Sequence, residues 1–453
     1  MDSQPLAAKN QAAKLRFSED AAAMPPFVWI RDWASTDPDR VAVVSSSGIA
    51  TYAELLAMIE RRSRTIAKEM PQSRLVPVRV ALDEPTVVEL SSVVAAGGVA
   101  MPYLEEAPTV EGIPGTEDVF AVPTSGSRGA ARVVRITAAN ITAAVLGSRS
   151  HLGTDSKDRW LLCLPLNHVG GLSILWRSFE AGGSVAIAPF DDKLPEFITA
   201  SKPTVASMVP TMVRRLLSVD AACLSALRFI LVGGAAVDPT LISDAHNNGV
   251  RLLATYGMTE ATSQIATEKP GAMTAGAIPL DGFTVSISHE SIPHEVPDHG
   301  RVLDPAATKG LVMVDGPAVS PGYLGEPDRE GPFVTNDIGW LDDSGVLHIA
   351  GRADDVVISG GVNVSIAAVS EAVRSVPGVD DAVAVGVPDP EWGSVVVVVV
   401  SGRLTSDELV AATWEMLEAP ERPKRWIVVD QIPLLPNGKH NIAAIEAMAA
   451  DIR

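Results

Sequence analysis

The chain has 453 residues, more than one compact hydrophobic core usually holds, so two or more domains are expected. Hydrophobic residues make up 47% and charged residues 20%, which is typical of a globular protein. The 36 basic and 55 acidic side chains give a formal net charge of -19. That balance argues against a nucleic-acid-binding surface, and it means that an anionic substrate needs a local positive site.

Cysteines and apolar runs exclude several other classes. Cys163 and Cys223 are the only cysteines, and neither lies in a CxxC pair, so neither a zinc site nor a disulfide framework is indicated. Cys163 lies in an apolar run and is expected to be a buried, inert thiol. The first 20 residues lack the apolar stretch of a secretory signal. The valine run at 395–400 is far shorter than the ~20 residues that span a bilayer. We therefore expect a cytoplasmic protein with no membrane span.

Strand and helix patterns alternate over the first 280 residues or so. Val41–Val44 predicts a strand, and Thr51 with Glu54 three residues later predicts the capping box of a helix. Further strands are expected over 78–82, 119–123, 158–164, 184–188 and 229–232, and helices over 91–100, 174–181 and 211–217. The alternation predicts an α/β fold with mainly parallel sheets, in which ligands bind at the carboxyl ends of strands.

The pattern changes after residue 283. Short strands at 283–287, 310–314, 333–334 and 346–349, separated by Gly, Pro and Asp, predict a small antiparallel sheet or barrel that closes the large domain. A compact α+β pattern then follows: strands at 355–359, 379–387, 395–401 and 425–429, with helices at 366–376 and 406–418. We expect an N-terminal domain over 1–351 and a small, mobile C-terminal domain over 352–453.

A run of small residues follows the strand at 119–123. Its glycines let the backbone approach an anion, and its hydroxyls and N–H groups are phosphate donors. Alone the pattern is weak, because Ser and Gly are common in any turn, and no Gly-Lys-Ser/Thr makes it a Walker loop. The run consists of Thr124, Ser125, Gly126, Ser127, Arg128 and Gly129.

Two segments place polar side chains directly after strands. His168 lies between an apolar run and two glycines, where composition alone favours an interior histidine over one that faces a cavity. In the second segment Tyr256 can stack on adenine, Thr259 can bind a phosphate, and Glu260 can bind Mg²⁺ through hard oxygen ligands. The simpler interpretation of that turn is a helix start with a capping residue, and both interpretations can hold together.

Three signals near the end of the chain carry charge. Asp337 follows a short strand and can accept hydrogen bonds from ribose hydroxyls, although Asp-Ile-Gly is also a common turn. Arg352 and Asp354 lie at the expected domain boundary. Lys439 ends Pro-Asn-Gly-Lys, which by itself describes a solvated turn lysine.

In this order along one chain, the motifs resemble the adenylate-forming acyl-CoA synthetase superfamily, and within it the o-succinylbenzoate–CoA ligases. The resemblance covers almost the whole chain. The Ser263-Gln264 pair after the Tyr256–Glu260 turn is the main reason for choosing that subfamily. The phosphate loop departs from the usual superfamily pattern, with Arg128 for Thr, Ala131 for Pro and Arg132 for Lys. Asn167 replaces the usual aromatic residue before His168, and the Arg that often follows the final lysine is absent.

The resemblance implies a role for each motif residue. Lys439 bridges the substrate carboxylate and the α-phosphate, Glu260 holds Mg²⁺, and Asp354 is the hinge. The nucleotide is bound by residues 124–129 with Gly234, Ala235, Tyr256, Gly257, Met258, Thr259, Asp337 and Arg352. The acyl group is bound by His168, Gly257, Ser263 and Gln264, and coenzyme A enters along Ser359, Gly360 and Gly361.

The implied reaction is a two-step ligation. A carboxylic acid reacts with ATP and Mg²⁺ to give an acyl-adenylate, and coenzyme A then displaces AMP. The implied acid is o-succinylbenzoate, for menaquinone synthesis. Its second carboxylate needs a cationic or polar anchor, which the sequence does not place. A homodimer remains compatible with the sequence.

Two alternatives stay open at this point. One is an acyl-CoA synthetase for another aryl or aliphatic acid. The other is a degenerate nucleotide-binding or adenylate-only protein, which the altered 128–132 loop and the missing Arg after Lys439 favour. The presence of Glu260, Asp337, Arg352 and Lys439 together argues against the second.

Overall fold

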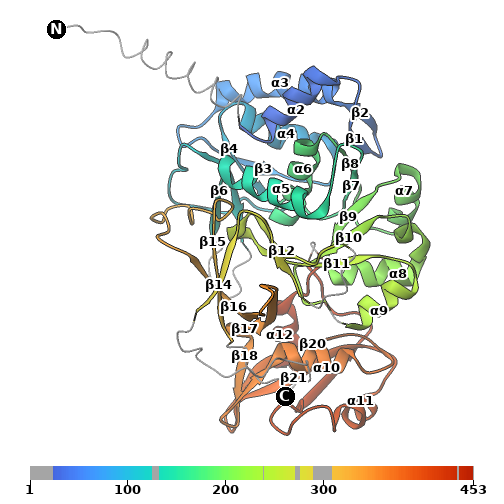
Figure 1. Cartoon of the computed structure of the whole chain (residues 1–453). Helices are drawn as coiled ribbons and strands as arrows, with labels where there is room; N and C mark the ends of the chain where they lie inside the picture. The colour runs from blue at the N-terminus through green and yellow to red at the C-terminus, as the bar shows by residue number, and fades with distance from the viewer. Residues whose placement is uncertain are drawn as a thin grey trace, which may run out of the picture. The chain divides into compact units, whose positions relative to one another are not determined.

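The computed structural model describes residues 24–124, 132–237, 239–270, 276–288, 309–435 and 438–451 (Figure 1). The chain divides into two compact units. The first comprises Met1–Val237, Ser243–Thr284 and Asp315–Phe333, and the second Asp238–Ile242, Val285–Val314 and Val334–Arg453.

A 9-stranded sheet forms the centre of the first unit, in the order β13-β12-β11-β10-β9-β7-β8-β1-β2. The strands from β11 to β1 in this order pair in parallel, whereas β2, β12 and β13 pair antiparallel at the two edges. The α/β class with mainly parallel sheets is therefore confirmed. The strands are β1 (Val41–Ser45), β2 (Gly48–Thr51), β7 (Arg159–Leu162), β8 (Ser184–Ile187), β9 (Val205–Met208), β10 (Phe229–Val232), β11 (Leu252–Met258), β12 (Ser263–Thr267) and β13 (Ile278–Pro279).

A second, 4-stranded sheet has the order β3-β4-β5-β6. Strands β3 (Leu75–Arg79), β4 (Val99–Tyr103) and β5 (Asp118–Pro123) are parallel, and β6 (Val133–Thr137) pairs antiparallel with β5. The helices of this unit are α2 (Phe27–Thr36), α3 (Tyr52–Glu69), α4 (Glu84–Ala95), α5 (Ala138–Leu152), α6 (Val169–Ala181), α7 (Leu194–Ser201) and α8 (Pro210–Ser225); α9 (Pro239–Asn247) crosses the division between the units.

Helix α6 is buried between the two sheets. On one side its Trp176 packs edge-on against Phe120 of β5, with ring centroids 5.3 Å apart. On the other side the Arg177 guanidinium lies 5.4 Å from the centre of the Trp160 ring of β7. A helix enclosed in this way must be apolar on most of its faces, which explains why nearly all its residues are buried.

Local signals predicted some element ends well and others poorly. The capping box of α3 is confirmed, because the Thr51 and Glu54 side chains each accept a hydrogen bond from the other residue's backbone N–H. The predicted helix at 91–100 was wrong at its end, since α4 stops at Ala95 and β4 begins at Val99. Gly97 adopts φ 82° there and ends the helix, so the small apolar residues beyond it form a strand. The strand expected at 78–82 is β3, shifted to earlier residues.

The second unit begins with a 4-stranded sheet in the order β14-β15-β16-β17. It corresponds to the sheet or barrel expected from the short strands after residue 283. One detail of that prediction was wrong: Asp337 does not follow a strand but lies inside β16, which is longer than expected. The strands are β14 (Thr284–Ser288), β15 (Gly310–Asp315), β16 (Phe333–Leu341) and β17 (Leu347–Arg352).

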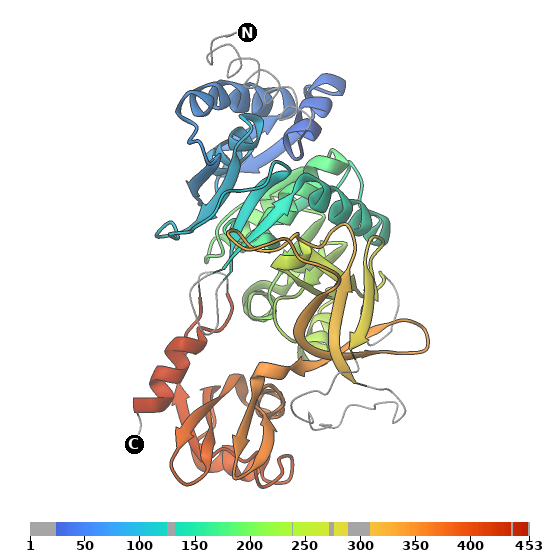
Figure 2. The same cartoon turned by 90° about the vertical axis from the view of Figure 1, so that its left-hand side faces the viewer.

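A 5-stranded sheet with helices on both faces makes up the rest of this unit (Figure 2). The valine run at 395–400 lies in β21, and its residues alternate between the two faces. Val396, Val398 and Val400 pack with α10 and α11, whereas Val395, Val397 and Val399 pack with α12. The elements are β18 (Val356–Ser359), β19 (Val362–Ser365), α10 (Ile366–Arg374), β20 (Val379–Asp389), β21 (Gly393–Gly402), α11 (Ser406–Thr413), β22 (Arg425–Val429) and α12 (Ile442–Asp451).

Leu409 tests this packing. Its side chain is fully buried between α11 and the sheet, so Leu409→Ala should lower the free energy of unfolding of the second unit by about 2–5 kcal/mol. Val410, the next residue, is 40% exposed, and Val410→Ala is the matched control with an expected change below about 0.5 kcal/mol. Urea denaturation measures both, and equal effects would contradict the described packing.

Candidate active site

Three segments singled out from the sequence follow parallel strands of the 9-stranded sheet and lie at one edge of it. Strand β7 leads to His168, β10 leads to Gly234 and Ala235, and β11 carries Tyr256 at its end. Because β9 pairs in parallel with both β7 and β10, and β11 with β10, the carboxyl ends of all these strands meet at the same edge. This is the edge at which open α/β sheets bind ligands.

A strained turn shapes the end of β11. Thr259–Ala261 forms a single 3₁₀ turn, and the next two residues, Thr262 and Ser263, adopt φ 55° and 105°. Non-glycine residues in such conformations cost about 1–3 kcal/mol each and persist only where the surroundings hold them. The Thr262 hydroxyl, fully buried, donates to the Ala318 carbonyl over 2.8 Å. The turn is thus fixed in a conformation that chain preference alone would not select.

Gly257 is required by the same turn. A Cβ at this position would lie 1.7 Å from the Ser263 carbonyl oxygen, so β11 and β12 approach too closely for any side chain. The sequence interpretation of a helix start at Thr259 is therefore only partly right, because the chain makes one turn and then returns as β12. Tyr256, Gly257 and Met258 lie in β11 before that turn.

Ser263 and Gln264 face different helices. The Ser263 hydroxyl lies 3.2 Å from the Ser173 hydroxyl of α6, the helix whose N-cap is His168. The Gln264 side chain is buried; its carbonyl oxygen accepts from Ser148 of α5 over 2.8 Å, and its amide donates to Thr267. The structure therefore brings Ser263 to the helix that bears His168, while Gln264 is held in the interior by its own hydrogen bonds.

Glu260 belongs to a chain of polar contacts. The Tyr323 hydroxyl donates to the Glu260 carboxylate over 2.8 Å. The Arg132 guanidinium stacks over the Tyr323 ring at 3.3 Å and forms an ion pair with Glu326, in which Nη2 donates to one carboxylate oxygen over 2.7 Å and Nε to the other over 3.2 Å. Burial and the Glu260 carboxylate raise the pKa of Tyr323, so its hydroxyl keeps its proton and remains a donor. Sequence reasoning missed Tyr323, because a lone tyrosine after Pro-Gly carries no pattern.

This arrangement fits the hard cation expected at Glu260. One carboxylate oxygen accepts from Tyr323, and among the described residues no side chain donates to the other, which can bind a metal. No group of three or more His, Cys, Asp or Glu side chains in the described part of the chain could enclose a metal. A Mg²⁺ ion here would therefore be held by Glu260 together with the phosphates of a nucleotide.

The phosphate loop is closed at its base. The backbone N–H and the hydroxyl of Thr124 both donate to the Arg132 carbonyl, over 2.8 and 3.0 Å. Residues 125–131 lie outside the described part of the chain, and with them Ser125, Gly126, Ser127, Arg128, Gly129 and Ala131. The base of the loop connects β5 to β6, which form an antiparallel pair.

Sequence reasoning also missed Arg177. Its side chain is 6% exposed, on α6 one turn after Ser173, and its face-on contact is with Trp160. Burial lowers the pKa of Arg177 to about 10, so the guanidinium stays charged at neutral pH. No carboxylate pairs with it among the residues described. The signal in the sequence was an arginine in the middle of a mostly apolar helix, since an unpaired buried cation is costly and rare.

Cys163 precedes the same helix but, unlike Arg177, is a buried side chain without charge. It is 1% exposed, and burial raises the pKa of its thiol to about 12. The expectation of a buried, unreactive cysteine is confirmed.

The second unit carries the remaining predicted site residues. Asp337 of β16 and Arg352 of β17 are direct partners in the antiparallel pair, and the guanidinium lies 3.4 Å from the carboxylate. The Asp337 backbone N–H donates to the Thr335 hydroxyl over 3.0 Å. Strand pairing thus brings together two residues that the sequence placed in separate motifs.

Lys439 lies on a closed turn. The Leu435 N–H donates to the Lys439 carbonyl over 2.7 Å, and Leu434 and His440 form an antiparallel bridge. The residue is exposed as a whole, yet desolvation of its ammonium group and the charge of Arg352 lower the pKa of Lys439. A lysine in such surroundings is a less strongly hydrated cation than one in bulk water.

Ser359, Gly360 and Gly361 form the hairpin between β18 and β19. Ser359 pairs with Val362, and the two glycines between them adopt φ 59° and 83°, as a two-residue type I′ turn requires. A Cβ on Gly360 would also lie 2.7 Å from the Trp392 ring. Asp354, the expected hinge, lies in the 3₁₀ turn Ala353–Asp355 between β17 and β18.

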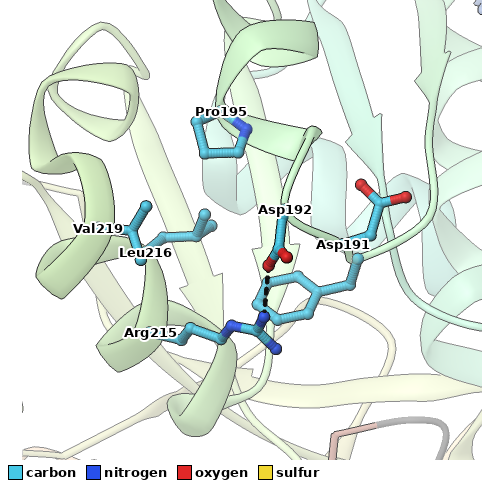
Figure 3. A pocket seen from close by; sticks show the side chains of 7 residues that line it. Asp191, Asp192, Pro195, Arg215, Leu216 and Val219 are labelled. Carbon is cyan, nitrogen blue, oxygen red and sulfur yellow. Dashed lines mark hydrogen bonds and ion pairs between the residues drawn. The ribbon is translucent and has the colours of Figure 1, made fainter.

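A surface pocket between α7 and α8 contains none of the predicted site residues (Figure 3). Its cation, Arg215, is paired with Asp192 at 2.7 Å and lies 5.6 Å from the Phe190 ring. Because an exposed carboxylate already neutralises that charge, the pocket has little positive charge with which to bind an anion.

The contact between Tyr323 and Glu260 predicts an effect on metal binding. Tyr323→Phe removes the hydroxyl that orients the Glu260 carboxylate, so affinity for Mg²⁺ in the presence of ATP should fall about tenfold. Titration with Mn²⁺ as a substitute for Mg²⁺, followed by electron paramagnetic resonance, measures the affinity of the site for a divalent cation. Tyr103→Phe at the end of β4 is the control. Equal affinities for the two variants would show that the hydrogen bond does not orient the carboxylate.

Two family models match the chain. The model described as AMP-binding enzyme matches residues 65–324, and the AMP-binding enzyme C-terminal domain matches residues 368–439. Among curated relatives, a 2-succinylbenzoate–CoA ligase of Lactococcus lactis is 32% identical over 70% of this chain and 68% of its own length. A 2-succinylbenzoate–CoA ligase of Bacillus cereus is 33% identical over 73% of this chain and 70% of its own length.

Solved structures agree with this match. o-Succinylbenzoate CoA synthetase from Bacillus subtilis, in complex with the acyl-adenylate intermediate, superposes with a TM-score of 0.78 at 25% identity, over 94% of this chain and 98% of that one. ATP-bound MatB from Rhodopseudomonas palustris shares the fold, with a TM-score of 0.80 at 22% identity over 94% and 99% of the two chains. In the described residues, no helix combines the length and hydrophobicity that crossing a membrane requires. The chain therefore belongs to the AMP-binding enzyme family.

Proposed function

We propose that this protein is an ATP-dependent, AMP-forming 2-succinylbenzoate–CoA ligase of menaquinone biosynthesis. Both curated relatives described above carry that name. The structural observation that supports the substrate is Arg177, a buried cation on the helix whose N-cap is His168. 2-Succinylbenzoate has two carboxylates, of which only one is activated, so the other needs a cation inside the acyl site.

Arg177 suits this second carboxylate for energetic reasons. Burying a guanidinium without a counter-charge costs several kcal/mol, on the order of the effective penalty for a single ion. A substrate carboxylate would offset that cost, and the planar guanidinium can bind it through two parallel hydrogen bonds. Ser173 lies one helical turn before Arg177 and contacts Ser263 of β12. Both serines would border the same space as His168.

The predicted nucleotide-binding residues have side chains suited to the different parts of ATP. Tyr256, beside Gly234 and Ala235, would stack on adenine, and Thr259 with residues 124–129 would bind the phosphates. Asp337 would accept the ribose hydroxyls, with Arg352 next to it. When bound beside Glu260, Mg²⁺ supplies positive charge that offsets the phosphate oxygens.

In the first step a substrate carboxylate oxygen attacks the α-phosphorus of ATP, the bond to the β-phosphate oxygen breaks, and pyrophosphate leaves. Negative charge on the α-phosphate increases in this transition state, and the Lys439 ammonium would stabilise it.

In the second step the thiolate sulfur of coenzyme A attacks the acyl carbon, the bond to the phosphate oxygen breaks, and AMP leaves. His168 and the Ser359–Gly361 turn would line the path of the thiol. We propose Asp354 as the hinge between domains 1–351 and 352–453, so that Lys439 is withdrawn before the second step. The reaction needs ATP, the acid and coenzyme A; a homodimer is compatible with it.

Substituting Lys439 tests the first step. Lys439→Ala should reduce acyl-adenylate formation about 100-fold or more, because a transition-state charge contact is lost. Thioester formation from supplied acyl-adenylate should stay within about threefold of the wild-type rate. Pyrophosphate release assayed over a panel of carboxylic acids, and AMP release with and without coenzyme A, separate this function from its alternatives. Equal loss of both half-reactions would exclude the proposed role.

Substituting Arg177 tests the substrate. Arg177→Met keeps the length of the side chain and removes the charge, so KM for 2-succinylbenzoate should rise roughly 10- to 100-fold. The analogue whose second carboxylate is a methyl ester should show little difference between wild type and variant. Arg215→Met, in the surface pocket, is the matched control. A KM that rises equally for the acid and its ester would rule out a carboxylate contact.

A further inference from the structure

His440, the residue after Lys439, makes a contact that the proposed reaction does not use. Its Nε2 lies 2.7 Å from a carboxylate oxygen of Asp381. A carboxylate only accepts hydrogen bonds, so Nε2 carries the proton and donates it. Both side chains are largely covered, at 18% and 21% exposure, which shields the contact from water.

Asp381 is itself fixed to the sheet of the second unit. It lies in β20, where the pairing with β21 shifts by one residue between Val379 and Asp381. Its other carboxylate oxygen accepts from the Ala382 N–H over 2.8 Å and lies 4.0 Å from the Arg374 guanidinium of α10. Arg374 also donates to the Ala382 carbonyl over 3.1 Å. The carboxylate that holds His440 therefore has little freedom to move.

The turn that carries Lys439 is closed on both sides of this contact. The bridge between Leu434 and His440 and the Leu435–Lys439 hydrogen bond close it from within. The Asn441 N–H donates to the Pro433 carbonyl over 2.9 Å, immediately beyond. The hydrogen bond from His440 to Asp381 connects this closed turn to β20.

We propose that His440 and Asp381 are positioning residues for Lys439: their hydrogen bond fixes the lysine turn to the sheet, so that turn and sheet move as one body. The inference rests on the proposed role of Lys439. A lysine side chain is long and flexible, and a misplacement of about 1 Å in a catalytic group can cost about 100-fold in rate. Fixing the backbone on which the lysine stands removes one source of such misplacement.

The test compares the two half-reactions in His440→Ala and His440→Gln. His440→Ala should reduce kcat for acyl-adenylate formation about 10- to 100-fold, with KM for ATP within about threefold of the wild-type value. Thioester formation from supplied acyl-adenylate should be unchanged. His440→Gln should recover most of the rate, because its amide N–H can still donate to Asp381.

His348 offers a matched control. It forms a similar pair with Asp342, at 2.9 Å, but in the sheet of β16 and β17. His348→Gln should leave both half-reactions near the wild-type rate. If His440→Ala does not fold, Asp381→Asn takes its place, since it keeps the shape of the side chain and weakens the contact. A reduction of adenylate formation alone, about three- to tenfold, is then expected.

Several outcomes would overturn the inference. They are unchanged adenylate formation in His440→Ala or, where that variant does not fold, in Asp381→Asn; equal loss of both half-reactions; and no recovery in His440→Gln. Lys439→Ala, measured alongside, separates this inference from the proposed function. If Lys439→Ala impairs adenylate formation selectively and His440→Ala does not, only the positioning role fails. If Lys439→Ala has no selective effect, the proposed role of the lysine fails first.

Discussion

The enclosure of α6 between two sheets is the constraint on which much of this structure depends. The helix must present apolar side chains to both sheets, which explains Trp176 against Phe120 on one side. The same enclosure removes water from around Arg177 and leaves it a charge without a carboxylate among the residues described. A buried charge of this kind raises the free energy of the protein without ligand, and a bound anion offsets that cost. Packing and the proposed selection of the substrate therefore involve the same helix.

Much of the fold could be predicted from the sequence, since the α/β alternation, the capping box of α3 and the buried valine strand are local patterns. The errors have local causes as well. Gly97 ends α4 and turns apolar residues from helix to strand, and β16 continues through Asp337 because Ile338 and Trp340 bury their side chains. A periodicity of small or apolar residues does not distinguish these cases, because neither glycine position nor sheet register is visible in it.

The sequence suggested candidate site residues where one residue type carries one kind of chemistry, as with Glu260, Tyr256 and Lys439, whose roles stay predictions. It was not predictable where the contact joins residues far apart in the chain. Tyr323 reaches Glu260 only because the segment after β15 returns to the β11 turn, and Arg352 meets Asp337 only through the register of β16 and β17. In the sequence Arg132 is only a departure from the usual pattern. Its stacking on Tyr323 and its ion pair with Glu326 depend on how the folded chain brings these residues together.

The sheet of the second unit has one more consequence. Strand β21 pairs with β18, β20 and β22, and its valines are covered on both faces, so close packing resists bending of this sheet. The glycine hairpin grows from β18, while the lysine turn is tied to β20 through His440. Both turns are thus attached to the same sheet, which keeps the distance between them constant. A rotation of this sheet would carry both turns together.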